Sequence, residues 1–286
     1  MRLYKRPSEK GFQTAIHKQK EEGTVLQALQ TLVKHIARTE VMPRFLSVPA
    51  DEKTDGSILT EADLAAQAAF AAALPRIAAC PMLGEEMNES AQRDLWLHHY
   101  DGLWVVDPID GTTNFANGFP HFALSAALMR QGKPVLGVVY DPVAGECFAA
   151  QSGGGAFLNG RPLPLAVRGK KLHRAIAGVE IKYLRSGKLA GRINTLSPVG
   201  SIRSMGSSTL DWCYLAAGRM DVYVHGGQKL WDYAAGALIL TEAGGSLATL
   251  EGDDFWSGEH TFQRSAIAAL SPELFAPWLA WIRANQ

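Results

Sequence analysis

The chain has 286 residues, enough for one large domain or for two closely packed halves. Its hydrophobic fraction of 47% and its charged fraction of 20% are ordinary for a soluble globular protein. The 28 basic and 28 acidic side chains balance, which argues against a nucleic-acid coat or a membrane-surface protein, since either needs a basic footprint.

The basic N-terminal stretch, residues 1–22, holds no apolar run of the length that a signal peptide needs. No segment approaches the roughly 18 uninterrupted apolar residues of a membrane span. We therefore expect a solvated extension followed by a single domain, residues 23–286, of two packed halves (23–166 and 167–286). The chain has three cysteines, Cys80, Cys147 and Cys213. They have neither the spacing of a zinc site nor the density of a disulfide scaffold, which favours reduced thiols in a cytoplasmic protein.

Two helices are predicted in the first 80 residues. Apolar residues recur with helical period from Val25 to about Arg38. After the turn signal Asp55-Gly56, Thr60 fits the N-cap of a second helix, because acidic residues follow it in the first turn. We expect Pro75 to close that helix.

Short apolar runs separated by turn residues predict strands in the middle of the chain. The first run ends at Pro108, which we expect to break the strand. The spacing is that of an antiparallel meander rather than the strand–helix alternation of a Rossmann fold. The predicted strands are residues 103–107, 122–129, 135–140 and 146–150.

Later segments alternate between helix and strand. We expect helices over residues 207–217, 231–241 and 274–282, and a short strand over residues 221–224.

The segment Asp107-Pro-Ile-Asp110 places two carboxylates three positions apart on a turn, where they can converge on a hard cation. The carbonyl of Ile109 lies between them. Gly111, Thr112 and Thr113 follow at an expected helix start, the usual setting for a bound phosphate. Asp-Pro and Asp-Gly also form ordinary turns, so this segment alone leaves both interpretations open.

Three further acidic segments have ordinary structural explanations as well. Glu85 follows a glycine on a loop, where glutamates are often merely solvated. Asp232 lies in the first turn of an apolar helix, where it complements the helix dipole. Asp63 follows the helix cap at Thr60.

Taken together, these pieces resemble the inositol monophosphatase superfamily. Four of its motifs occur in the expected order, and the resemblance extends from about residue 25 to residue 245. They are Lys53 to Asp63 (K-x-D-x-S-x-x-T-x-x-D), Gly84 to Glu86 (G-E-E), Asp107 to Thr113 (D-P-I-D-G-T-T) and Trp231 to Gly236 (W-D-x-A-A-G). The resemblance implies an α/β fold of α+β type: a layered α-β-α-β-α sandwich of the inositol monophosphatase and fructose bisphosphatase type.

The resemblance also implies magnesium-dependent hydrolysis of a small phosphate monoester, and two to three bound Mg²⁺ ions. Glu85, Asp107 and the Ile109 carbonyl would hold one ion; Asp107, Asp110 and Asp232 would hold another. An all-oxygen ligand set without His or Cys also favours magnesium over zinc. Lithium sensitivity and a homodimer are implied by analogy.

Catalytic roles carry over in the same way. Thr112, paired with Asp63, would act with Glu85 on the attacking water. The phosphate would be held at Gly111, Thr112 and Thr113. Further substrate contacts would come from Gly206, Ser207, Ser208, His225 and Asp232.

One departure affects the substrate. His225 occupies the position where animal inositol monophosphatases carry an inositol-binding glutamate, so it either binds another polyol or is a solvated loop residue. Lys229 could meet a second phosphate, which leaves an adenosine bisphosphate nucleotidase as an alternative. A non-catalytic relative that acts by protein contact, through the basic N-terminal extension, is the other alternative.

Overall fold

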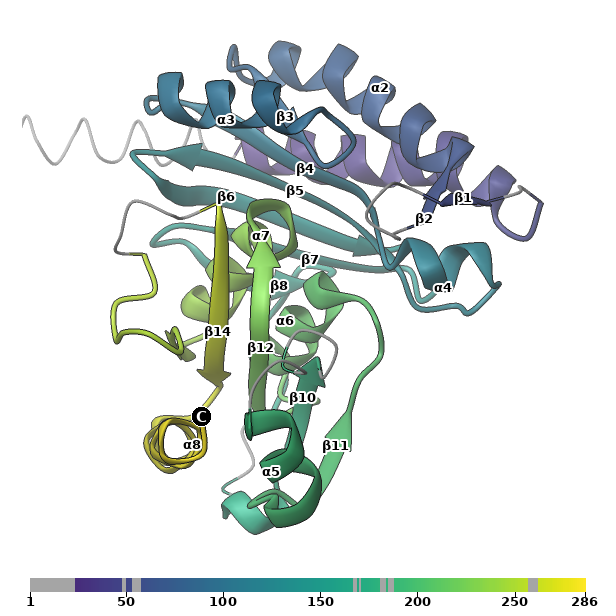
Figure 1. The fold of residues 1–286 in the computed structure, drawn as a ribbon. Coiled ribbons are helices and arrows are strands. Elements are labelled where there is room, and N and C mark those ends of the chain that lie inside the picture. The colour runs from purple at the N-terminus through teal and green to yellow at the C-terminus, as the bar shows by residue number, and fades with distance from the viewer. Residues whose placement is uncertain are drawn as a thin grey trace, which may run out of the picture.

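The computed structural model describes residues 24–47, 50–52, 58–166, 169, 171–180, 184, 188–256 and 262–286 (Figure 1). The N-terminal extension and residues 53–57 of the first motif lie outside these ranges. Within them, no helix combines the length and the apolar character that crossing a membrane requires.

The first half of the chain forms a seven-stranded sheet. Its strands follow one another in chain order from one edge to the other, and all neighbours are antiparallel except the first pair. The predicted meander is therefore present, extended at both edges. The strands are β3 (Met82–Gly84), β4 (Leu103–Asp110), β5 (Ala123–Arg130), β6 (Lys133–Asp141), β7 (Glu146–Gln151), β8 (Gly155–Leu158) and β9 (Arg161–Pro162).

The second half forms a five-stranded sheet with the order β11-β10-β12-β14-β13. The first three strands in this order are parallel, and the last two pair antiparallel. A separate two-stranded pair, β1 (Ala50–Glu52) and β2 (Ile58–Thr60), precedes both sheets. The five strands are β10 (Ile176–Glu180), β11 (Ser201–Arg203), β12 (Val222–Lys229), β13 (Ser246–Ala248) and β14 (Gln263–Ala269).

Helices lie outside and between the two sheets (Figure 1). An N-terminal helix over residues 24–36 continues into the π-helical turn η1 (Ala37–Val41) and the 3₁₀ turn η2 (Met42–Arg44). The others are α2 (Glu61–Ile77), α3 (Glu89–His98), α4 (Thr112–Ala116), η3 (Leu172–Arg174), α5 (Lys188–Leu196), α6 (Ser208–Ala216), α7 (Leu230–Glu242) and α8 (Pro272–Ala284).

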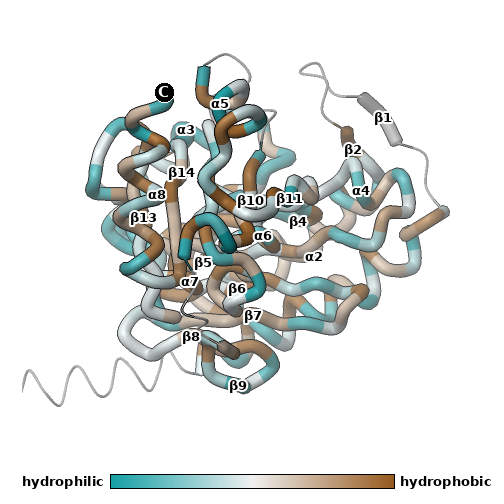
Figure 2. The backbone as a smooth tube through the Cα atoms, turned by 90° about the horizontal axis from the view of Figure 1, so that it is seen from below, coloured by the Kyte–Doolittle hydropathy of each residue, from teal (hydrophilic) through white to brown (hydrophobic). Residues whose placement is uncertain are grey.

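Strand alternation explains the layers. In β4, Trp104 packs toward the N-terminal helix and α2, whereas its neighbour Val105 packs toward α6 and α7. In β12, Tyr223 joins the core shared with α6 and α7, and Val224 joins the core beneath α5 and α8. Each sheet is therefore buried on both faces, and the expected α-β-α-β-α sandwich is confirmed. Figure 2 shows the apolar segments concentrated in this interior.

Three predicted ends are wrong. The strand expected over residues 221–224 continues to Lys229 in β12. Helix α2 continues through Pro75 to Ile77, because a proline in the last turn removes one hydrogen bond while the N–H of Ala78 still reaches the Leu74 carbonyl. Strand β4 continues through Pro108 to Asp110, because the pairing with β5 shifts register at that point instead of ending.

Candidate metal centre

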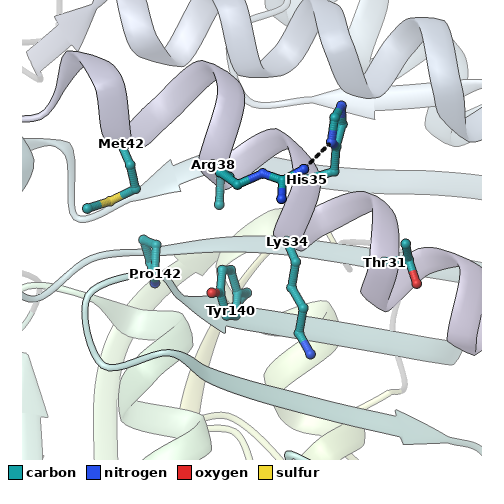
Figure 3. A pocket seen from close by; sticks show the side chains of 8 residues that line it. Thr31, Lys34, His35, Arg38, Met42, Tyr140 and Pro142 are labelled. Carbon is teal, nitrogen blue, oxygen red and sulfur yellow. Dashed lines mark hydrogen bonds between the residues drawn. The ribbon is translucent and has the colours of Figure 1, made fainter.

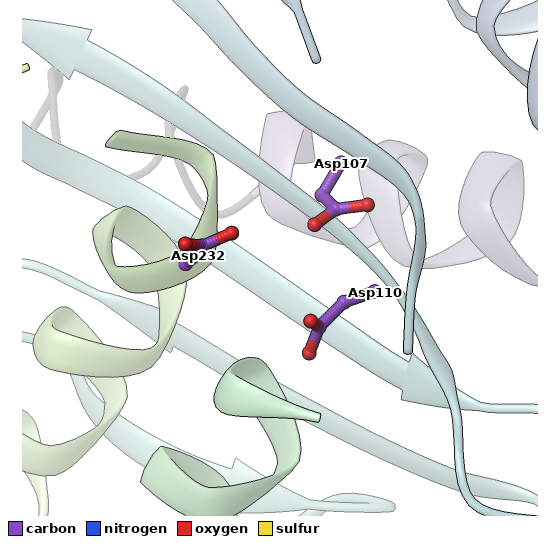
Figure 4. Close-up of side chains that lie close together, drawn as sticks. All are labelled: Asp107, Asp110 and Asp232. Atoms are coloured by element: carbon purple, nitrogen blue, oxygen red, sulfur yellow. The ribbon is translucent and has the colours of Figure 1, made fainter. Parts of the chain in front are cut away.

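The register shift in β4 places Asp107 and Asp110 on one side of the sheet. Asp107 pairs with Ser125 and Asp110 with Ala123, so three steps along β4 match two along β5. Residues three apart in a regular strand point to opposite faces. The extra residue is a β-bulge that restores the parity, so that both carboxylates point into the space in front of α7 (Figure 4).

Asp232 comes from the first turn of α7 and completes a group of three carboxylates. One oxygen from each of Asp107, Asp110 and Asp232 lies within 4.8 Å of the other two (Figure 4). Asp232 also caps its own helix, since its Oδ2 accepts the N–H of Lys229 at 2.8 Å. The capping role of this residue is thus real and coexists with the cluster.

Asp110 is oriented by the start of α6. Its Oδ2 accepts three hydrogen bonds: from Ser207 Oγ at 2.6 Å, from Thr209 Oγ1 at 2.6 Å and from Thr209 N at 2.7 Å. The protein donors therefore concentrate on one oxygen, and Oδ1 is the oxygen that we expect to face a cation. A carboxylate that binds a metal through one oxygen commonly accepts hydrogen bonds from the protein on the other.

The carboxylates of the cluster are buried close together, so their ionised forms repel one another. Burial, and then the neighbouring carboxylates of Glu85, Asp110 and Asp232, hold the pKa of Asp107 well above its usual range. Burial, followed by Asp110 and Glu85, likewise raises the pKa of Asp232. Within the described residues, the buried Oδ1 of Asp107 has no hydrogen-bond partner. A divalent ion would satisfy this oxygen and offset the repulsion, so the residues present fit a hard metal.

The carboxylates line a cavity of about 320 Å³. All five predicted metal ligands border it, together with every predicted substrate contact except Ser207 and His225. The lining residues are Glu85, Asp107, Ile109, Asp110, Gly111, Thr112, Thr113, Asn114, Glu180, Gly206, Ser208 and Asp232.

Glu85 reaches the cavity from the end of β3. Its N–H donates to the Val106 carbonyl at 3.1 Å, and its own carbonyl accepts from Gln92 Nε2 at 2.9 Å. The backbone on which this glutamate sits is therefore tied to β4 and to α3. Glu85 itself lies in the turn that follows β3, is half-buried and borders the cavity.

A narrow turn brings Gly111, Thr112 and Thr113 to the cavity. Gly111 has φ +91°, and a Cβ there would lie 3.1 Å from the Gly206 carbonyl oxygen, so only glycine fits without strain. Asn114 Nδ2 donates to the His121 carbonyl at 2.7 Å and to the Met205 carbonyl at 2.8 Å. Asn114 thereby fastens α4 to the loop that contains Gly206, on the opposite wall.

Thr112 and Asp63 lie next to each other at the cavity edge. Thr112 Oγ1 is 3.4 Å from Asp63 Oδ1 and 2.9 Å from the Ile109 carbonyl. Asp63 is buried, and its Oδ2 accepts from the N–H and the hydroxyl of Thr60 at 2.8 and 2.6 Å. The predicted helix cap at Thr60 and the predicted pairing of Thr112 with Asp63 are therefore one connected arrangement.

Three predicted contacts have other positions. Ser207 is buried and serves Asp110 instead of lining the cavity. His225 is 1% exposed within β12, and burial lowers its pKa to about 3, so it is a neutral strand residue and not a solvated loop histidine. The Lys229 ammonium lies 6.0 Å from the centre of the Phe262 ring and does not line the cavity.

Asn114, Glu180 and Thr209 contribute without having been predicted. Asn114 and Thr209 act across more than 90 residues of sequence, which no local pattern reveals. Glu180 ends β10, and the apolar run before it, residues 176–179, was a strand signal that could have placed it.

Known proteins resemble this chain in sequence and in fold. A family model described as the inositol monophosphatase family matches residues 19–284. The inositol-1-monophosphatase of Mesorhizobium japonicum is 40% identical over 184 residues, which are 60% of this chain and 69% of that one. The Nus factor SuhB of Pseudomonas aeruginosa is 38% identical over 253 residues, 82% of this chain and 86% of that one. The solved structure of the extragenic suppressor protein suhB from Bartonella henselae has a TM-score of 0.77 at 28% identity, and covers 92% of this chain and 99% of that one.

Proposed function

The chain belongs to the inositol monophosphatase family, and on that premise we propose that it hydrolyses a small phosphate monoester with the help of magnesium. The observation that carries the proposal is the three-carboxylate group of Asp107, Asp110 and Asp232, which lines one cavity together with the segment from Gly111 to Thr113. Carboxylates bind cations, and backbone N–H groups at a helix start bind anions. A site that hydrolyses a phosphate ester needs both kinds of group side by side.

Two to three Mg²⁺ ions would be held by Glu85, Asp107, Asp110, Asp232 and the Ile109 carbonyl, and all five residues border the cavity. Bound magnesium would lower the pKa of water and neutralise phosphoryl oxygens. The N–H groups of Gly111, Thr112 and Thr113 would bind the phosphate at the start of α4.

The remaining groups position the attacking water. Thr112 Oγ1 lies 3.4 Å from Asp63 Oδ1 and 2.9 Å from the Ile109 carbonyl, so its single proton goes to one of these acceptors and its lone pairs are left for the water. Glu85 borders the same space and would accept the proton of the water as general base. No side-chain nucleophile is required, and we expect direct attack by water in line with the leaving alcohol.

For the alcohol portion, inositol monophosphate or a related polyol or sugar phosphate is favoured. The cavity of about 320 Å³ suits a small ester, and Glu180 on its wall is an acceptor for hydroxyl groups. An adenosine bisphosphate is less favoured, because Lys229, the residue available for its second phosphate, lies over Phe262 outside the cavity lining.

Other properties follow from family resemblance. We propose inhibition by lithium, a cytoplasmic location and a homodimer. Their support is the family assignment and relatives named inositol-1-monophosphatase.

A second candidate function is protein contact without catalysis. Relatives that match this chain are named Nus factor SuhB, a name that describes a role other than hydrolysis. All five proposed metal ligands line the cavity, and this supports the enzyme instead.

Release of inorganic phosphate from a panel of esters at matched concentrations tests the proposal. The panel includes inositol 1-phosphate, a sugar phosphate and adenosine 3′,5′-bisphosphate, each assayed with magnesium and after exhaustive chelation. We expect magnesium-dependent turnover of the first two, and a loss of at least roughly 100-fold in Asp110→Asn. Turnover that survives chelation, or no turnover of any ester, would contradict it.

A further inference from the structure

A second hollow, of about 590 Å³, lies between the N-terminal helix and the end of β6, and it shares no lining residue with the metal cavity. Its volume is within the range of small-molecule sites, roughly 300–1,000 Å³. The proposed phosphatase chemistry leaves it without a role.

One wall of this hollow is cationic. Lys34 and Arg38 are one helical turn apart and therefore occupy the same face of the N-terminal helix, next to His35 (Figure 3). Arg38 Nη2 lies 3.3 Å from His35 Nδ1, a contact that holds the guanidinium at the rim. Within the described chain, neither Lys34 nor Arg38 has a carboxylate within 4.0 Å. Arg44, one turn beyond the hollow, is by contrast paired with Glu40.

The facing wall is largely apolar. It consists of Tyr140 and Pro142 from the end of β6, while Met42 from η2 adds an apolar side chain on the helix side (Figure 3). The nearby Asp141 is not among the residues that line the hollow, and its Oδ1 accepts the N–H groups of Val143 and Ala144 at 2.9 Å each. Burial raises the pKa of Tyr140, so its hydroxyl stays protonated and available as a donor.

The helix changes its winding at this place. The α-helix becomes π-helical at Ala37, and both Ala37 and Arg38 line the hollow. Short π-helical turns inside α-helices are rare and occur frequently at functional sites. Here the turn and the residue that follows it supply Ala37, Arg38 and Met42 to the lining of the hollow.

We propose that this hollow is a binding site for a small organic phosphate or phosphonate, separate from the catalytic centre. The anionic group would contact Lys34 and Arg38, with the Tyr140 hydroxyl as a further donor. The apolar part of the ligand would lie against Met42 and Pro142. This combination selects a dianion that carries a ring or a longer alkyl group over one that carries only a methyl group or none.

The test uses the full chain with magnesium and two probes that cannot be hydrolysed, phenylphosphonate and methylphosphonate. Methyl NMR of labelled methionines reports each site separately, because Met42 lines the hollow and Met205 adjoins the catalytic cavity through Asn114. We expect phenylphosphonate to shift the Met42 signal in a saturable manner and to bind there several-fold more tightly than methylphosphonate.

Variants identify the cations. Lys34→Gln combined with Arg38→Gln should weaken the response at Met42 by roughly tenfold or more and leave the response at Met205 unchanged. Arg76→Gln, which removes an exposed charge from α2, is the matched control and should leave both responses intact. The proposal is overturned if only Met205 responds, if the double variant binds as tightly at Met42 as the intact chain, or if the two probes bind equally. Thermal unfolding confirms that each variant is folded.

Discussion

Two of the metal-ligand candidates direct their Oδ2 atom to protein donors, although they belong to different elements. Asp110 receives donors from Ser207 and Thr209, and Asp232 receives the N–H of Lys229. Such partners fix the rotamer of a ligand and reduce the entropy that binding must remove. They matter for metal affinity even though they touch no ion.

We expect the double substitution of Ser207→Ala and Thr209→Val to raise the magnesium concentration required for half-maximal activity by roughly tenfold or more. The Thr209 N–H remains, so Asp110 keeps one of its three donors. The measurement is a magnesium titration of phosphate release. Thr195→Val, which removes a hydroxyl bound only to a carbonyl within α5, is the control and should change nothing. An unaltered magnesium requirement in the double variant would mean that these hydroxyls do not orient Asp110.

Thr112 and Asp63 should act as a unit. We expect Thr112→Ala and Asp63→Asn each to lower kcat with little effect on the magnesium requirement. The kcat of the double variant should be no lower than that of the less active single variant. Asp63 also accepts from Thr60 at the start of α2, so its substitution should cost about 1 kcal/mol of stability, measured separately by urea unfolding. Losses in kcat that multiply in the double variant would refute the pairing.

At the scale of elements, the ends of strands and helices were predicted less well than their centres. The apolar runs placed β4 to β7 because burial on both faces leaves a clear signal. The bulge at Pro108 was missed because its cause is the pairing with β5, which lies outside the local sequence. The acidic side chains Glu85, Asp107, Asp110 and Asp232, which line the cavity, were identified from their motifs. Asn114 and Glu180 were not, because their roles depend on how the two halves of the chain meet at the cavity.

Helices α6 and α7 occupy the layer between the two sheets, and they approach closely at Gly236. A Cβ on Gly236 would lie 2.4 Å from Cβ of Trp212, closer than any real contact. We expect Gly236→Ala to destabilise the protein by about 1–3 kcal/mol, the usual cost of overpacking, as measured by urea unfolding. Gly191→Ala is the matched control, since that glycine lies exposed in α5 with nothing within 4 Å of the added carbon. It should be neutral or stabilising by up to about 1 kcal/mol.

The centre as a whole depends on the molecule bringing distant segments together. β4 and α4 come from the first half of the chain, whereas α6 and α7 come from the second. Neither half alone contains all three clustered aspartates, because Asp107 and Asp110 belong to one and Asp232 to the other. A bound cation would therefore connect the two halves, and metal binding should stabilise the entire fold.

This connection predicts how stability depends on pH. Without metal, burial and mutual repulsion hold the pKa values of Asp107 and Asp232 in the folded chain well above the ordinary aspartate value of about 3.9. Between these values the folded state binds more protons than the unfolded state, so the free energy of unfolding contributed by these groups falls as pH rises from about 4 through the raised pKa values. Magnesium binds the ionised form, so it competes with protons and stabilises more at higher pH.

We expect the difference in Tm between magnesium-saturated and chelated protein to be small near pH 5 and to grow toward pH 8. Calorimetry at fixed ionic strength measures it. A difference that does not change with pH, or one that persists in Asp107→Asn combined with Asp232→Asn, would show that the cluster is not where the ion binds.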